Sequence, residues 1–360
     1  MASAPGTAQK KIFFTTQLLE WAQHENKRQL PWKEEKDPYR IWLSEIILQQ
    51  TRAEQGRPYY ERFIATYPTL KDLAAAPDDD VFRLWQGLGY YNRCRNMLET
   101  ARYLVAENAG KFPESFEELL ALKGIGSYTA AAIASFAFGR PHAVVDGNVI
   151  RVLARVFAIE TPFDTTAGKK EFQQLATSLL AKETPALFNQ AIMDLGATIC
   201  LPLSPVCGAC PERKICTAFQ EGRINLLPVR SKKQPVKQRF FHYLILQWEG
   251  TIWLHRRGPA DIWQNLYEPY LIEAGTALDS KALLLQESVQ ALSLQGPLSF
   301  AGSLRQRLTH QQLEIRFFIA ELSAKPQMAG ADGQWVPVQQ LGRLAFPRSL
   351  VSFFQKNHYF

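Results

Sequence analysis

The spacing of hydrophobic residues divides the chain into two parts. From residue 10 to residue 220, apolar residues recur every three to four positions, as on amphipathic helices, and polar breaks such as KFPES and KGIGS interrupt them at short intervals. Beyond residue 240 the pattern changes to strand-like runs, which are FFHYLILQW (240–248), TIWLHRR (251–257) and LEIRFFIAEL (313–322). We therefore expect a mainly α-helical domain followed by an α+β domain.

A short basic segment joins these two parts. Between Pro228 and Arg239 the chain carries five basic residues, two prolines and no acid. Such a composition disfavours a helix and is typical of an exposed linker. We assign residues 8–225 to the first domain, 226–239 to the linker and 240–360 to the second domain.

Charge and hydropathy narrow the class of protein. The 360 residues include 41 Lys and Arg against 34 Asp and Glu, which gives a net charge of +7. A basic chain suits a polyanionic partner such as nucleic acid, although an excess of this size is also common on solvated surfaces. The chain has no apolar run long enough to span a bilayer, and its polar opening MASAPGTAQKK does not resemble a signal peptide. We expect no association with a membrane.

Four cysteines lie within seventeen residues, with the spacing Cys200-x6-Cys207-x2-Cys210-x5-Cys216. Four cysteine thiolates are the usual ligands of a [4Fe-4S] cluster. Structural zinc is the alternative, but zinc sites usually have two tight knuckles, and only Cys207 and Cys210 form one here. The pattern favours a cluster, and it places the chain in a reducing compartment. The fifth cysteine, Cys94, is expected to be a free thiol.

Two glycines precede a helix rich in small residues. In Gly124-Ile125-Gly126-Ser127 the turn directs backbone N–H groups and the positive end of the helix dipole toward one point, which suits a phosphate. An ordinary tight turn has the same pattern. Asp146 follows twenty residues after Gly126, before the helical run NVIRVLARVFAI. An aspartate in that place is either a helix cap or a functional carboxylate.

Glu45 lies in a helical segment that is apolar almost all round, IWLSEIIL. A carboxyl group in such surroundings has a raised pKa, which keeps a proton available near neutral pH. A surface glutamate on an amphipathic helix is the alternative.

Together these features resemble the helix-hairpin-helix DNA glycosylases, over residues 10–225, and the second domain narrows the resemblance to the MutY family of adenine DNA glycosylases. The resemblance implies a helix-hairpin-helix domain with the hairpin at 119–139, a [4Fe-4S] cluster loop at 200–216, and a C-terminal Nudix-like α+β domain. Endonuclease III is the alternative within the superfamily. Its relatives carry a lysine nucleophile where this chain has Tyr128, and tyrosine cannot form a Schiff base. A monofunctional glycosylase is therefore expected.

The resemblance also assigns roles to the two carboxyl groups. Glu45 would protonate adenine, and Asp146 would stabilise the oxocarbenium ion at the sugar. Tyr128 and Asn148 would hydrogen-bond these groups or the base.

Base excision requires the target nucleotide to be flipped out of the duplex. The residues that match the family's DNA contacts are Gln50, Thr51, Leu88, Tyr90, Gly124, Gly126 and Ser127. A Gly-x-Gly-aromatic turn such as that at 87–90 is also common as an ordinary break between two helices. The residues that match the adenine pocket are Arg28, Leu30, Trp32 and Gln190. Two positions depart from the family pattern, since Lys33 replaces a frequent arginine and Gln190 stands where glutamate is common.

The second domain lacks the acidic helix of catalytic Nudix hydrolases. The segment LDSKALLLQESVQAL (278–292) has a single glutamate, so we expect no pyrophosphohydrolase activity. The family reads 8-oxoguanine with a loop that corresponds to Leu308-Thr309-His310, and Thr309 and His310 are the expected contacts. A surface turn is the alternative.

These expectations define the partners of the protein. We expect a monomer that binds double-stranded DNA with adenine opposite 8-oxoguanine or guanine, in the cytoplasm and associated with the nucleoid. A DNA-binding module without catalytic activity would keep the glycines, the cysteines and the basic linker, but it would not need Glu45 and Asp146.

Overall fold

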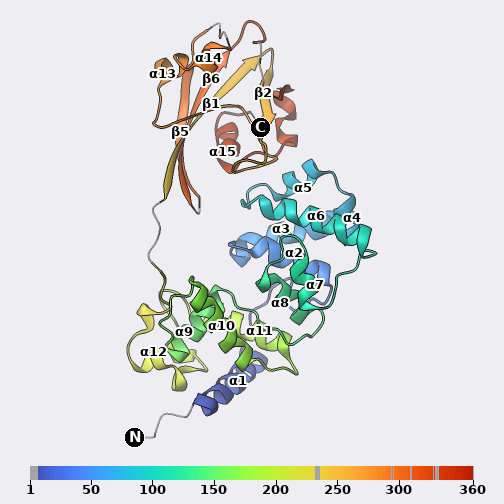
Figure 1. Ribbon diagram of the computed structural model, residues 1–360, viewed down its shortest axis with the longest axis vertical. Coiled ribbons are helices and arrows are strands. Elements are labelled where there is room, and N and C mark those ends of the chain that lie inside the picture. The colour runs from blue at the N-terminus through green and yellow to red at the C-terminus, as the bar shows by residue number, and fades with distance from the viewer. Residues whose placement is uncertain are drawn as a thin grey trace. The chain divides into compact units, whose positions relative to one another are not determined.

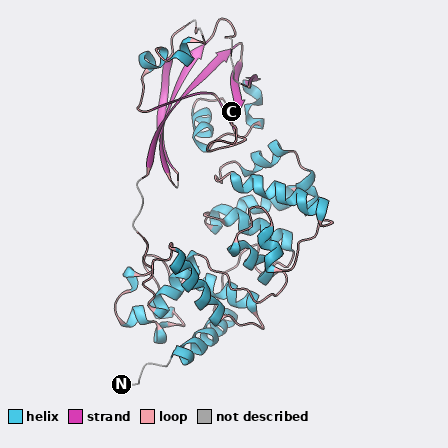
Figure 2. Ribbon diagram, in the orientation of Figure 1, coloured by secondary structure: helices cyan, strands magenta, loops and turns pink. Residues whose placement is uncertain are grey.

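The computed structural model describes residues 7–231, 236–292, 294, 296–308, 310–326, 328 and 332–359. Helices fill the first two-thirds of the chain and the strands come after them (Figures 1 and 2). The packing divides the chain into two compact units, Met1–Ala74 with Glu99–Lys233 and Ala75–Leu98 with Gln234–Phe360. Within the described residues no helix is long and apolar enough to cross a membrane.

The first unit is built from helices and short 3-10 turns. Its elements are α1 (Thr7–His24), α2 (Pro38–Leu48), α3 (Ala53–Thr66), α4 (Leu70–Ala75), the second part of α6 (Asn92–Glu107), α7 (Phe116–Ala121), α8 (Ser127–Phe136), α9 (Gly147–Phe157), α10 (Thr166–Leu179), α11 (Pro185–Thr198), η1 (Cys207–Ala209), η2 (Arg213–Ile215), α12 (Thr217–Gln220) and η3 (Ile224–Leu226). Helices α1, α9, α10 and α11 share one apolar core, which includes Phe14, Leu153, Phe172 and Phe188.

Helix α2 is central to the rest of this unit. Asp37 caps its N-terminus by accepting a hydrogen bond from Tyr39 N at 2.9 Å, and Pro38 begins the helix, where its missing N–H is not needed. The helix ends before Gln50, whose φ of 58° is left-handed. Residues on nearly all sides of α2 are buried, because α2 packs against both α3 and α8. This packing brings Glu45 of α2 close to α8.

The second unit contains a seven-stranded sheet. Its strands are β1 (Lys237–Trp248), β2 (Thr251–Arg256), β3 (Tyr267–Glu268), β4 (Tyr270–Ala274), β5 (Ser299–Arg307), β6 (Gln311–Glu321) and β7 (Gly333–Pro337). The order is β3-β2-β1-β6-β5, with β4 paired to β1 and β7 paired to β2; β1 and β6 are parallel. The helical elements of this unit are α5 (Asp78–Trp85), the first part of α6, α13 (Ser280–Leu284), α14 (Glu287–Gln290), η4 (Val338–Arg343) and α15 (Arg348–Lys356).

Alternation along β1 produces a core on each face of the sheet. Phe241, Tyr243 and Ile245 pack with residues of α15, whereas Leu244 and Leu246 pack with residues of α13 and α14. The strand-like runs predicted at 240–248, 251–257 and 313–322 correspond to β1, β2 and β6.

Two features of this unit were not predicted. Arg239, which we assigned to an exposed linker, lies in β1 and is 9% exposed. It is buried because it forms paired hydrogen bonds with Asp261 and Glu273 at 2.6 to 2.8 Å. In addition, residues 75–98 pack with the C-terminal segment: Tyr91 Oη donates to Phe346 O at 3.2 Å. Linker residues 232–235 lie outside the described residues.

Candidate active site and cysteine loop

Glu45 is a buried carboxyl group, only 8% exposed. Burial raises its pKa from 4.5 to about 7, and the nearby charge of Asp146 acts in the same direction, while a hydrogen bond with Tyr128 lowers it. Burial also raises the pKa of Tyr128 well above its usual range, so the phenol stays neutral. Glu45 can therefore hold a proton at neutral pH and release it to a partner in the site.

Asp146 caps the N-terminus of α9. One carboxylate oxygen accepts from Val149 N at 2.8 Å, and the other accepts from Asn148 Nδ2 at 2.7 Å. Burial has the largest effect and raises the pKa of Asp146 above its usual value, although these two donors and the charge of Arg151 act in the opposite direction. The helix cap, one of the two roles that the sequence allows for Asp146, is present in the structure. Two hydrogen-bond donors thus favour the charged form of Asp146 against the effect of its burial.

Asn148 connects Asp146 to the first cysteine. Its side-chain oxygen accepts from Arg151 Nη2 at 2.8 Å. Arg151 in turn donates to Cys200 O and Gly196 O, both at 2.6 Å. The Asn148 side chain thus links the Asp146 carboxylate to Arg151. The sequence analysis did not single out Arg151.

A cavity opens next to Glu45. Trp32, Lys33 and Gln190 line it together with Glu45, as do Glu34, Glu35, Lys36, Ile41, Ser44, Phe136, Ala186 and Leu187. The structure thus brings Trp32 and Gln190 together with the predicted acid. Arg28 and Leu30 are not among the described residues that line the cavity. Arg28 instead pairs with Asp194 at 2.8 Å, and Asp194 was not identified from the sequence.

The predicted hairpin connects α7 to α8. Gly124 has a φ of 76°, a left-handed conformation that favours glycine, and Gly126 is the N-cap of α8. Gly124, Gly126 and Ser127 are exposed. The first N–H groups of α8 are therefore accessible to an anion such as a phosphate.

The other predicted DNA contacts differ in exposure. Gln50 and Tyr90 are exposed, and both have left-handed backbones, with φ of 58° and 49°. Thr51 is partly exposed, next to Gln50. Leu88, in contrast, is 7% exposed and belongs to the core. In the turn at 87–90, the side chain presented to solvent is that of Tyr90.

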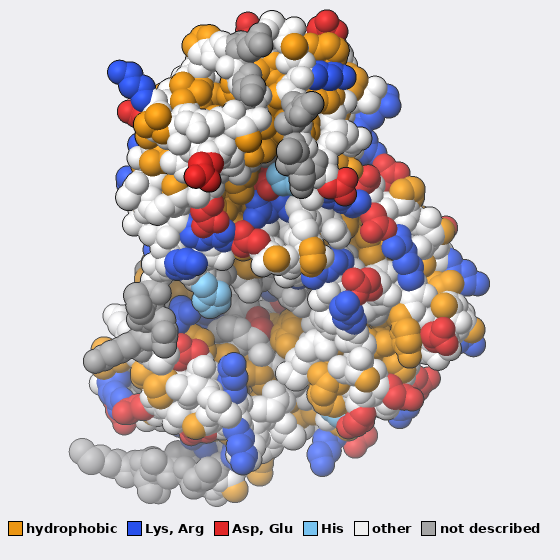
Figure 3. All heavy atoms as spheres, turned by 45° about the horizontal axis from the view of Figure 1, so that its top comes forward, with side chains coloured by type: hydrophobic (Ala, Val, Ile, Leu, Met, Phe, Trp, Pro, Cys, Tyr) orange, Lys and Arg blue, Asp and Glu red, His pale blue; other side chains and the backbone are white. Residues whose placement is uncertain are grey.

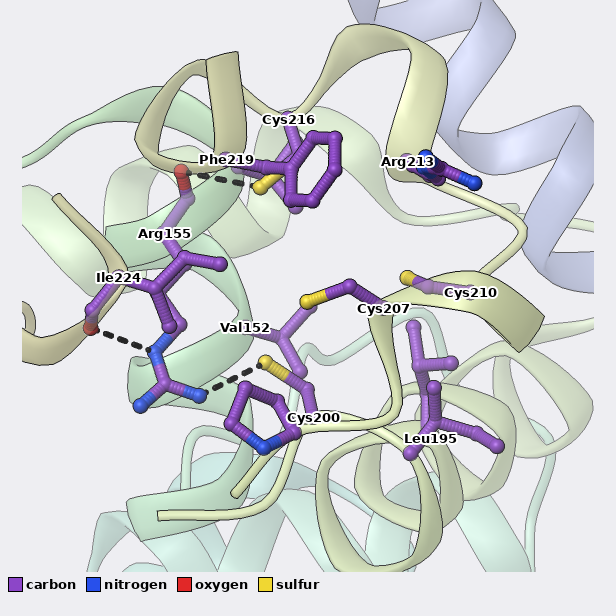
Figure 4. Close-up of a pocket in the computed structure, with 13 residues that line it drawn as sticks. Val152, Arg155, Leu195, Cys200, Cys207, Cys210, Arg213, Cys216, Phe219 and Ile224 are labelled. Atoms are coloured by element: carbon purple, nitrogen blue, oxygen red, sulfur yellow. Dashed lines mark hydrogen bonds between the residues drawn. The ribbon is translucent and has the colours of Figure 1, made fainter. Parts of the chain in front are cut away.

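The four cysteines line one cavity, and their sulfurs face the same space (Figure 4). Its other lining residues are mostly apolar, such as Val152, Leu195 and Phe219. Burial raises the pKa of Cys210 to about 12, so a positive partner is needed to stabilise thiolates here. Within the described residues, no three Cys, His, Asp or Glu side chains converge as ligands of a single metal ion. Cys94 is buried and distant in sequence from this loop.

Arg155 holds the cysteine loop in place. It is 2% exposed, and its guanidinium donates to Leu201 O at 2.7 Å and to Pro202 O at 2.9 Å. The same guanidinium approaches Cys200 Sγ at 3.4 Å. The backbone oxygen of Arg155 accepts from Cys216 Sγ at 3.5 Å. The sequence analysis missed Arg155, although two arginines four residues apart in the apolar run NVIRVLARVFAI are a usable signal.

His310, which is predicted to read the opposite base, lies in the turn between β5 and β6. His310 is exposed there, and its carbonyl oxygen accepts from Lys237 N at 3.2 Å. Thr309 lies outside the described residues. The segment 278–292 forms the short helices α13 and α14 with Glu287 as its one glutamate.

Figure 3 shows the charged side chains on one face of the molecule. On that face, Lys and Arg side chains alternate with acidic ones and form no single continuous patch.

Comparison with known proteins agrees with this architecture. The HhH-GPD superfamily of base excision DNA repair proteins matches residues 43–182, and the NUDIX domain matches residues 242–356. The adenine DNA glycosylase of Buchnera aphidicola subsp. Baizongia pistaciae (strain Bp) is 37% identical over 261 residues, which cover 71% of this chain and 72% of the relative. The adenine DNA glycosylase of Rattus norvegicus is 44% identical over 227 residues, 60% of this chain and 44% of the relative.

Two solved structures resemble the first part of the chain. A thermostable thymine-DNA glycosylase is 29% identical with a TM-score of 0.56, and it is matched over 60% of this chain and 100% of its own length. Endonuclease III in a non-covalent DNA complex is 22% identical with a TM-score of 0.53, over 61% of this chain and 99% of its own length, which shows a shared fold. The predicted helix-hairpin-helix fold and Nudix-like domain are confirmed.

Proposed function

The chain belongs to the adenine DNA glycosylase family and is a DNA glycosylase of base excision repair, and on that premise we propose that it removes adenine mispaired with 8-oxoguanine or guanine in duplex DNA. The observation that carries this proposal is the pair of opposed carboxyl groups, Glu45 with a pKa of about 7 and Asp146 held by two hydrogen-bond donors.

The two carboxyl groups divide the chemistry between them. Glu45 donates its proton to N7 of adenine, so that the base leaves as a neutral molecule. The C1′–N9 bond breaks, and positive charge develops on the sugar. Asp146 stabilises this oxocarbenium ion, either as a charge or through a transient covalent bond, and Glu45 then helps to activate the water that completes hydrolysis. Asn148 and Val149 N keep Asp146 in its charged form.

Tyr128 accounts for a glycosylase without strand cleavage. Its hydroxyl interacts with Glu45 and lies 3.8 Å from Met193 Sδ. A phenol cannot form a Schiff base with the abasic sugar, so the reaction ends with base release. The endonuclease III alternative, which requires an amine at this position, is disfavoured.

DNA is held by several separated elements in this proposal. The exposed N–H groups at Gly126 and Ser127 bind a phosphate. Gln50 and Tyr90 enter the base stack and keep the adenine flipped out. The turn with Thr309 and His310 contacts 8-oxoguanine. We propose that the protein acts as a monomer at the DNA of the cytoplasm.

We assign a [4Fe-4S] cluster to Cys200, Cys207, Cys210 and Cys216. The arrangement fits, because the four sulfurs face one shared, mostly apolar space, and each cysteine of such a cluster binds a different iron. The cluster would supply folding energy and hold the loop, whose Arg213 and Lys214 are available for phosphates. No catalytic step needs it.

A single-turnover assay tests the proposal. Duplexes with adenine opposite 8-oxoguanine, guanine or thymine are incubated with excess enzyme, and base release is measured after alkaline cleavage. We expect release from the first two duplexes and none from A:T. Release of oxidised pyrimidines instead, or efficient borohydride trapping of a covalent adduct, would contradict the proposal. Unchanged adenine release by Asp146→Asn would favour a different catalytic group.

A further inference from the structure

One fully buried carboxylate contacts several polar residues, two of which line the cavity next to Glu45. Asp194 of α11 is 0% exposed. Its contacts are Arg28 Nη1 at 2.8 Å and Gln190 Nε2 at 3.0 Å on Oδ1, and Asn26 Nδ2 at 2.8 Å and Lys33 Nζ at 3.4 Å on Oδ2. Every one of these partners is a donor. Two of them are cations, and the Asp194 oxygens act as acceptors toward all four.

This network determines which way the amide of Gln190 points. Gln190 and Asp194 are four residues apart on α11, so their side chains meet on one face of the helix. A glutamine amide has a donor end and an acceptor end, and their assignment follows from the neighbouring groups. Because the Asp194 oxygens accept from every neighbouring partner, Nε2 is the end of the amide that faces Asp194, at 3.0 Å from Oδ1. The opposite end of the amide, Oε1, is directed away from Asp194, on a side chain that lines the cavity with Glu45.

We infer that Asp194 is a positioning residue for base recognition, which holds Gln190 so that its Oε1 accepts a hydrogen bond from the 6-amino group of adenine. This inference rests on the proposed function. Adenine presents the N7 acceptor beside the N6 amino donor. A base that takes a proton from Glu45 at N7 therefore needs an acceptor next to that acid. If the Gln190 amide were reversed, its Nε2 would face the 6-amino group of adenine, and two donors would oppose each other.

The same reasoning explains how a glutamine can stand at position 190, where a glutamate would also present an acceptor to the base. A glutamate accepts with either oxygen and needs no orienting partner. A glutamine does need one, and Asp194 fulfils that requirement.

The test compares adenine with purine, which lacks the 6-amino group, at the same position opposite 8-oxoguanine. Single-turnover excision rates are measured for the unmodified protein and for Asp194→Leu, which leaves no acceptor for Gln190 Nε2. The variant should excise adenine about 10-fold more slowly, the equivalent of one hydrogen bond of ~1.4 kcal/mol, with little change for purine. The double variant Gln190→Glu with Asp194→Leu should recover the adenine-to-purine ratio, because a glutamate presents an oxygen to the base in either orientation.

Asn26→Ser is the matched control. It removes a different donor from the same carboxylate and leaves Gln190 in place, so the adenine-to-purine ratio should not change. Equal losses for both bases in Asp194→Leu, or an equal shift in Asn26→Ser, would show a structural role and overturn the inference. Should Asp194→Leu not fold, Gln190→Leu must show the same selective loss for adenine, and an unchanged ratio overturns the inference. Failure of the unmodified protein to release adenine would instead refute the proposed function.

Discussion

Replacing Glu45 by glutamine should abolish catalysis and at the same time stabilise the protein above neutral pH. Glutamine has nearly the same shape and cannot ionise. Loss of the general acid should reduce the single-turnover rate by about 10²- to 10⁴-fold. The gain in stability follows from the raised pKa of Glu45, because the native state of the unmodified protein must accommodate a buried charge once this group ionises.

The size and sign of the stability effect can be worked out. The pKa of Glu45 rises from 4.5 to about 7 in the folded protein. The native state therefore binds the proton more tightly than the unfolded state, and stability falls as pH rises from 4.5 through 7. The loss is about 3 kcal/mol at pH 8 and about 1 kcal/mol at pH 5. The stability of Glu45→Gln relative to the unmodified protein should therefore increase by about 2 kcal/mol between pH 5 and pH 8.

Urea unfolding of both proteins at pH 5 and pH 8 measures this difference. Glu171→Gln, an exposed position on α10, is the control and should show no such pH dependence. The single-turnover rate of the unmodified protein should also fall about tenfold per pH unit above pH 7, as the proton on Glu45 is lost. A stability difference that is the same at both pH values would refute the assignment of a buried, protonated carboxyl group.

Three further substitutions have defined outcomes. Tyr128→Lys places an amine beside the predicted sugar site, so strand cleavage and a borohydride-trapped adduct should appear; no adduct would mean that position 128 does not reach the sugar. Arg155→Leu leaves the carbonyls of Leu201 and Pro202 without their donor, and should cost about 3 kcal/mol and lower the iron content of the purified protein; an unchanged iron content would contradict its role in the loop. Arg257→Leu removes the guanidinium partner of Glu268, which is 2% exposed and keeps Tyr243 Oη and His255 Nε2, and should destabilise the second unit by about 3 to 5 kcal/mol in chemical unfolding; a neutral effect would contradict the importance of that buried pair.

The parts that sequence could predict are those in which local pattern carries the information. Glu45 stands in a segment without a polar face, so its burial follows from the sequence, and the left-handed turn at Gly124 follows from glycine at that position. Arg155, Asp194 and Arg239 could not be predicted in the same way. Apart from Gln190, four residues before Asp194, the partners described above lie 22 to 168 positions away along the chain, and only tertiary packing brings a donor and an acceptor together over such separations.

The packing of residues 75–98 with the C-terminal segment has the same origin. Helix α5 has an ordinary amphipathic pattern, which predicts a helix but does not identify the surface that will cover its apolar side. The pairing of Arg256 with Asp79 at 3.0 Å joins positions far apart in sequence. Such contacts become visible only once the fold is known.

Helix α9 serves two sites at once. Its N-cap is Asp146, and three further positions on its next turns, Asn148, Arg151 and Arg155, lead to the cysteine loop. The eleven residues of α9 extend only ~16 Å, so substitutions within one short helix can affect both sites. An inherited change at any of these four positions would disturb a carboxylate and a metal loop that lie in different stretches of the sequence, and among relatives these positions should vary together or not at all.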